Sequence, residues 1–147
     1  MIDHVWTVVC SRAVIDRESN NVSIQNVIEQ ITIQGEPLPD GWLGIEMTAI
    51  SLWARSAPDT PARGKMRLSF VSPSGVELGS FEGKINLNEH PRSRNIFRFT
   101  KLPLKENGWH YFRVYLQING EWQEIGKIPL EVSFLSEDET LTDSPGQ

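Results

Sequence analysis

The chain has 147 residues, of which 39% are hydrophobic and 22% are charged, an ordinary composition for one globular domain. Its net charge is −5, and four acidic residues with no basic residue follow Ser136, so the rest of the chain is close to neutral. A near-neutral body excludes an electrostatic basis for nucleic-acid binding. The single cysteine, Cys10, excludes an internal disulfide.

Domain organisation follows from the same numbers. We predict one β-sandwich domain over residues 1–135, followed by an acidic, disordered tail over residues 136–147. The sequence lacks an N-terminal secretion signal and lacks an apolar run long enough to span a membrane. We therefore expect a cytoplasmic protein without a membrane partner.

The first half of the chain reads as strands separated by polar turns. "HVWTVVCSRAVID" and "NVSIQNVIEQITI" flank the turn "RESNN" and predict a first hairpin. "LGIEMTAISLWAR" fits either a short helix or a strand, and Thr48, Ile50 and Trp53 favour the strand. "KMRLSF" alternates strictly and ends at the turn "SPSG". The apolar phase of the next strand then shifts, which predicts a bulge near Gly79.

The stretch "GWHYFRVYLQINGEWQEIGKIPLEV" (108–132) is the clearest element, a β-hairpin. Apolar residues and His110 occupy its even positions, which places them on one face of a strand with period two. Asn119 and Gly120 supply the positive φ angles of a two-residue turn. On the return strand, Gly126 indicates a bulge, and Pro129 indicates a sheet edge because proline lacks an amide donor.

Seven or eight short strands with closely spaced turns, and no convincing amphipathic helix, determine the predicted fold class. We expect an all-β protein, an antiparallel two-sheet β-sandwich of the immunoglobulin-like type or a similar Greek key. A sandwich of this kind hosts many unrelated functions, so the function must be argued from its surface.

Three segments also carry a resemblance to a known family. "VVCSRAVIDRESNNVSIQNVIEQI", "FVSPSGVEL" and "LPLKENGWHYFRVYLQINGEW", with "IPLEV" closing the last hairpin, span about residues 5–134. In these segments the chain resembles a family of small, mainly bacterial β-sandwich proteins, a domain of unknown function. The resemblance implies a sandwich fold, and it implies no catalytic residues that could be carried over to this chain.

Residues capable of chemistry are few and scattered. Cys10 follows two valines within a strand, where a buried, inert cysteine is common. The histidines lack the spacing of a metal site, and we expect His110 to be a core-edge histidine bonded to a loop carbonyl. We therefore predict no catalytic, cofactor-binding or metal-binding residues, no cofactor, and no enzymatic activity. The basic residues Arg92, Arg94 and Arg98 fit either a site for an acidic partner or a solvated loop.

The odd positions of the 108–118 strand form the candidate site. Trp109, Tyr111, Arg113 and Tyr115 would line the outer face of the sheet, and aromatic and arginine side chains dominate protein interfaces. Loops that cover them, or simple pairing across strands, are the alternatives. Two further tryptophans are candidates for the same patch, Trp42 and Trp122.

These residues favour a non-enzymatic module that binds a protein partner or associates with a second copy of itself. A carbohydrate-binding module is the alternative, because exposed aromatic rings on sandwiches also stack on sugars. A small enzyme with a loop site near His90, Arg92 and Arg94 rests on residue types alone.

Overall fold

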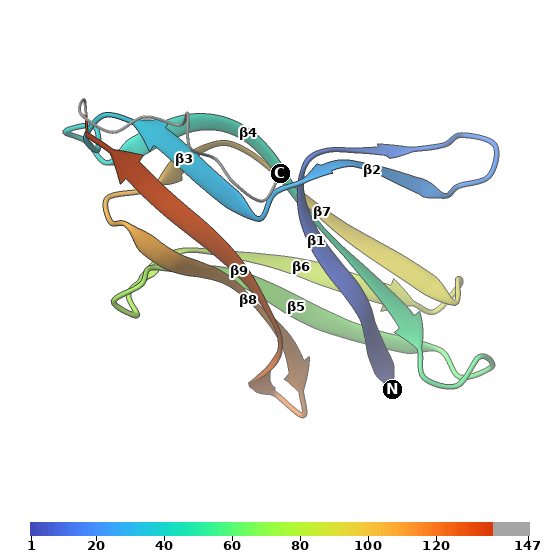
Figure 1. Ribbon diagram of the computed structural model, residues 1–147. Coiled ribbons are helices and arrows are strands. Elements are labelled where there is room, and N and C mark those ends of the chain that lie inside the picture. The colour runs from blue at the N-terminus through green and yellow to red at the C-terminus, as the bar shows by residue number, and fades with distance from the viewer. Residues whose placement is uncertain (137–147) are drawn as a thin grey trace.

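A computed structural model describes residues 1–136 of the chain as nine strands joined by turns (Figure 1). Within these residues no helix has the length and apolar character needed to cross a membrane. In chain order the strands are β1 Ile2–Ile15, β2 Val22–Val27, β3 Gln30–Gln34, β4 Trp42–Arg55, β5 Ala62–Val71, β6 Glu77–Leu87, β7 Arg92–Pro103, β8 Gly108–Ile118 and β9 Glu121–Leu135.

The strands form two sheets. Sheet A is four-stranded with the order β2-β1-β4-β7, and sheet B is five-stranded with the order β3-β9-β8-β5-β6. All pairs in sheet A are antiparallel, whereas β3 runs parallel to β9 in sheet B. The predicted all-β class is confirmed. The predicted seven or eight strands and their wholly antiparallel arrangement are wrong, because the described residues form nine strands and β3 pairs with β9 in parallel.

The difference arises between β2 and β3, which the sequence pattern presents as one return strand. Asn26 has a left-handed φ of 56°, a conformation that asparagine tolerates better than most residues. Its side-chain amide donates to Ser11 Oγ at 2.7 Å. The chain therefore stops pairing with β1 after Val27 and resumes at Gln30 in the other sheet.

The core lies between the sheets and receives side chains from both. Met66, Leu68 and Phe70 of β5 are buried in the predicted phase. The even residues of β8 pack against them, and sheet A supplies Met47 and Trp53. Burial of apolar surface is the dominant stabilising term, so the apolar face of each strand turns to the core. The opposite face of the strand is left available for binding.

The turns and bulges that shape the sheets follow local sequence signals. Asn119 and Gly120 have φ of 51° and 82°, as a two-residue hairpin turn requires. The β5–β6 register shifts beside Gly79, and the β8–β9 register shifts beside Gly126, so both predicted bulges are confirmed.

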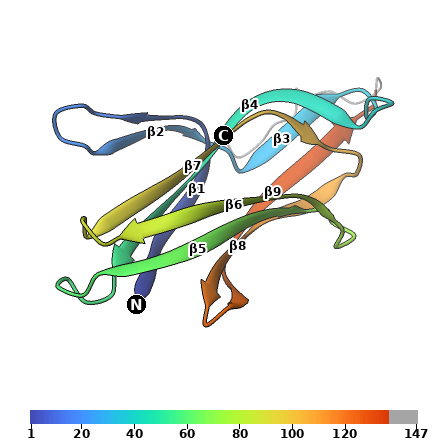
Figure 2. The same cartoon turned by 180° about the vertical axis from the view of Figure 1, so that it is seen from behind.

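The two sides of the molecule differ. On one side β6 and β7 lie next to each other across the sheets (Figure 2), and a Cβ on Gly83 would lie 2.6 Å from Asn95 Nδ2. On the other side are β1 and β9. Residues 2–9 of β1 pair only with β4, and residues 121–130 of β9 pair only with β8, among the strands described. The predicted tail, residues 136–147, lies outside the described residues apart from Ser136.

Candidate functional site

The four residues of the predicted site lie on the outer face of sheet B. Even positions of β8 are buried, and Trp109, Tyr111, Arg113 and Tyr115 point away from the core. Trp109 is 49% exposed, and the other three are half-buried. The predicted orientation of the strand is therefore correct, and Trp109 is the most accessible of the four.

Two of the four contact side chains on the neighbouring strand β9, and Tyr115 has charged residues opposite it. The Lys127 ammonium lies 4.0 Å from the centroid of the Tyr111 ring. Arg113 Nε lies 3.7 Å from a Glu124 carboxylate oxygen. Tyr115 is opposite Glu124 on β9 and opposite Arg67 on β5. Cross-strand pairing thus accounts for much of this face, as one of the two alternatives anticipated.

The pairing continues across sheet B. Arg67 contacts Glu82 at 3.3 Å, and its guanidinium carbon lies 4.7 Å from the Trp122 ring centroid. Trp122 therefore joins this face. Trp42 does not, because it begins β4 in sheet A, where the Lys101 ammonium lies 4.7 Å from its ring.

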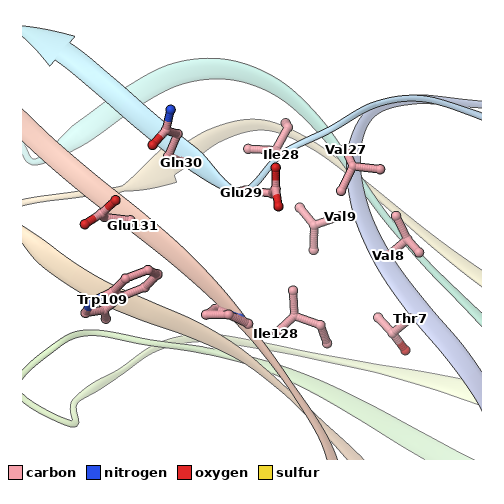
Figure 3. Close-up of a pocket in the computed structure, with 11 residues that line it drawn as sticks. Thr7, Val8, Val9, Val27, Ile28, Glu29, Gln30, Trp109, Ile128 and Glu131 are labelled. Carbon is pink, nitrogen blue, oxygen red and sulfur yellow. The ribbon is translucent and has the colours of Figure 1, made fainter. Parts of the chain in front are cut away.

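Trp109 differs from its neighbours because it lies beside a groove of about 520 Å³ on the β1–β9 side. We call this the Trp109 groove. Figure 3 shows Trp109 and Glu131 on one side of it and Val8 and Val27 on the other. The remaining lining residues are Thr7 and Val9 of β1, Ile28, Glu29 and Gln30 of the β2–β3 segment, and Ile128 and Pro129 of β9.

Backbone hydrogen bonds hold the walls of the groove together. The Ile28 amide donates to the Val9 carbonyl at 2.9 Å, and the Glu131 amide donates to the Glu29 carbonyl at 3.1 Å. Trp109 is directly opposite Glu131 in the β8–β9 register. The switch of the chain from sheet A to sheet B therefore places two glutamates and an exposed indole around one opening.

The strand edges next to the groove are interrupted. Pro129 lacks an amide donor on the part of β9 that has only β8 as a neighbour, which confirms the predicted edge. The β1 register shifts between His4 and Trp6, so Val5 forms a bulge there. Prolines and bulges on edges hinder the addition of another strand. The groove is therefore better suited to a side chain than to an added β-strand.

The Val5 bulge also creates a polar chain that sequence reasoning missed. His4 Nε2 and Thr7 Oγ1 are 2.7 Å apart, and Thr7 Oγ1 and Ser51 Oγ are 2.7 Å apart. Burial lowers the pKa of His4, which also packs against Trp53. The threonine hydroxyl stands between the imidazole and the serine, so the chain is not arranged as a histidine-activated serine nucleophile.

Cys10 and His110 are fully buried. Burial raises the pKa of the Cys10 thiol, and a backbone hydrogen bond from Arg12 acts in the opposite direction. A buried thiol with a raised pKa is a poor nucleophile. His110 Nδ1 lies 3.2 Å from the Gly108 carbonyl, and the ring stacks on Phe70. The predicted core histidine bonded to a main-chain carbonyl is confirmed, but that carbonyl belongs to the first residue of β8 and not to a loop.

The basic residues predicted to form a loop lie mainly on a strand, because Arg92, Arg94 and Arg98 belong to β7 and only His90 precedes it. His90 and Arg92 are exposed, and the Arg94 guanidinium donates to the main-chain and side-chain oxygens of Asn20 in the β1–β2 turn. Arg94 thus helps to hold that hairpin. Across residues 1–136, no three metal-ligating side chains come close enough together to hold a metal ion.

The groove residues other than Trp109 were not candidates on sequence grounds. Val27, Glu29 and Glu131 read as ordinary strand residues, because a groove formed by three distant segments has no local pattern. Asn26, an asparagine within an apparent strand, is the one local sign that the chain turns before the groove.

Comparison of the chain with protein-family models gives no match, and comparison with curated proteins gives none either.

Proposed function

We propose that the protein is a non-enzymatic β-sandwich module that binds another protein through the Trp109 groove. The observation that carries the proposal is the indole of Trp109, which is 49% exposed at the rim of a groove. Tryptophan is the residue most enriched among interface hot spots, because it buries a large apolar area when a partner covers it. The neighbouring Tyr111, Arg113 and Tyr115 would form the rim of the contact.

The proposal includes an immunoglobulin-like topology, which the strand order supports. The neighbours β1, β4 and β7 correspond to strands A, B and E of that fold. The neighbours β9, β8 and β5 correspond to strands G, F and C, with β6 next to C as in variable domains. Domains of this architecture present both loops and sheet faces to partners.

A second copy of the chain is the other partner that this proposal admits. A cytoplasmic location and membership of the bacterial family that the sequence resembles stay predictions that the sequence alone supports. Carbohydrate binding has less support than protein binding, because the Lys127 ammonium already occupies one face of the Tyr111 ring. A sugar site would have to depend mainly on Trp109, the most exposed ring of this face.

The test compares Trp109→Ser with Trp42→Ser as a matched control. Trp42 is a tryptophan of similar exposure, 41%, and lies outside the groove. We expect a lysate partner, or self-association in sedimentation, to be retained by the wild type and Trp42→Ser and lost in Trp109→Ser. Circular dichroism checks that both variants are folded. Binding that survives in Trp109→Ser, or a wild type that has neither partner nor self-association, contradicts the proposal.

A further inference from the structure

The charges around the Trp109 groove are of one sign. Glu29 and Glu131 line it, and no lysine or arginine of the described residues does. Neither carboxylate has a salt-bridge partner within residues 1–136. The Glu131 amide donates to the Glu29 carbonyl, so the two residues are held as neighbours. Two carboxylates of the same sign, unpaired within the described residues, make the potential of the groove negative, which favours a cation there.

The apolar part of the groove suits an aliphatic chain. Val8, Val27 and Pro129 line it, and Val27 is 54% exposed, so its side chain has little cover in the described structure. The indole of Trp109 stands at the same opening as Glu131 (Figure 3). A tryptophan ring face attracts cations, and more strongly when the site is shielded from water.

The strand edges argue against a ligand that pairs as a β-strand. Pro129 has no amide to donate, and Val5 bulges out of the register of β1. An added strand would leave its own hydrogen-bonding groups unpaired at these positions. A long side chain that reaches into the groove needs no such pairing.

We propose that the Trp109 groove binds an arginine side chain presented by the partner protein, an inference that rests on the proposed function. The three methylene groups would pack on the valines and Pro129. The guanidinium would lie against Trp109 and donate to Glu131, its cross-strand neighbour, while Glu29 adds to the negative potential of the groove. Arginine fits better than lysine, because its planar guanidinium stacks on an indole while its edge donates several hydrogen bonds to carboxylates.

A pair of small probes tests the inference directly. N-acetyl-arginine N-methylamide carries the proposed side chain, and N-acetyl-citrulline N-methylamide has nearly the same shape without the charge. The full-length protein is titrated with each, and NMR follows the Trp109 indole N–H and the amides of residues 27–31 and 130–132. We expect the arginine probe to shift these signals saturably and to bind about tenfold more tightly than citrulline.

Variants locate the contact. Glu131→Gln and Glu29→Gln keep the shape of the side chains, and each is expected to weaken the arginine probe about threefold or more. Glu121→Gln is the control, because Glu121 is an exposed carboxylate outside the groove, at the β8–β9 turn, and its replacement is expected to change nothing. Added salt should weaken the arginine probe and leave citrulline unaffected.

Three results would overturn the inference: equal binding of the two probes, shifts confined to residues outside the groove, or no saturable shift up to about 10 mM. Failure here is separable from failure of the proposed function. A partner that is lost in Trp109→Ser but retained in the double variant Glu29→Gln/Glu131→Gln would uphold the interaction module and reject arginine as its ligand.

Discussion

His110 is a buried titratable residue of the core, and its hydrogen bond indicates which ring nitrogen carries the proton. Its Nδ1 faces the Gly108 carbonyl at 3.2 Å. A carbonyl can only accept, so Nδ1 carries the hydrogen and Nε2 keeps the lone pair in the neutral ring. Nε2 is buried without a protein partner within the described residues. Burial lowers the pKa of His110, against smaller raising effects from Gly108 and Glu106.

This environment predicts a pH-dependent stability. The unfolded chain takes up a proton on His110 near its ordinary pKa of 6.5, whereas the folded ring resists protonation. The contribution of His110 to the free energy of unfolding should therefore be complete above the unfolded pKa. It should be lost as the pH falls towards the lowered pKa of the folded protein. His4, whose pKa is also lowered by burial, acts in the same direction.

Urea unfolding at about pH 7.5 and about pH 5.5 measures the effect, and His110→Phe should show a smaller difference than the wild type. His90→Asn, at an exposed position, serves as the control. An unchanged pH dependence in His110→Phe would show that other groups are responsible.

Individual strands were predictable where their pattern is local. The alternation of β8 and the Asn119–Gly120 turn depend only on neighbouring residues, and both predictions are confirmed. The separation of β2 from β3 depends instead on β9, since Ile31 and Ile33 pair with Val132 and Phe134. No window of the sequence contains both partners, so the parallel pair could not be predicted.

Contact between β6 and β7 gives a prediction at this scale. A Cβ at position 83 would lie 2.6 Å from Asn95 Nδ2, and that amide donates to the Lys84 carbonyl at 3.0 Å. Gly83→Ala must displace Asn95 and weaken this bond, so we expect a loss of about 1–3 kcal/mol in the free energy of unfolding. The measurement is the urea midpoint.

Gly44→Ala is the matched control, because a Cβ there meets no atom within 4 Å and the backbone is not left-handed. A variant Gly83→Ala as stable as Gly44→Ala would show that the Asn95 side chain moves aside without cost.

Across the whole molecule, the sheets approach each other at β6 and β7 and leave the Trp109 groove between β1 and β9. The sequence could place Trp109 on an outer face, because side-chain direction in a strand follows from period two. It could not distinguish Trp109 from Tyr111, Arg113 and Tyr115. Only Trp109 of the four lies beside the groove, because the β2–β3 segment lines the groove where the chain crosses from sheet A to sheet B.

The extent of the folded unit gives the prediction at this scale. The last strand ends at Leu135, where it pairs with Gln34. A chain truncated after Ser136 keeps every described strand and the core, so its free energy of unfolding should match that of the full chain within about 0.5 kcal/mol. Urea unfolding of both chains in the same buffer is the test. A larger loss would show that residues 137–147 contribute to folding.

The position of β9 has a consequence for the protein during its synthesis. β9 is made after the eight other described strands, yet it lies between β3 and β8 in sheet B. Until residues 121–135 have left the ribosome, β3 has no parallel neighbour, and Ile31 and Ile33 cannot reach their places beside β9. The nascent chain therefore carries β3 without its partner while the residues between Gln34 and Glu121 are made, and sheet B closes only after β9 has emerged.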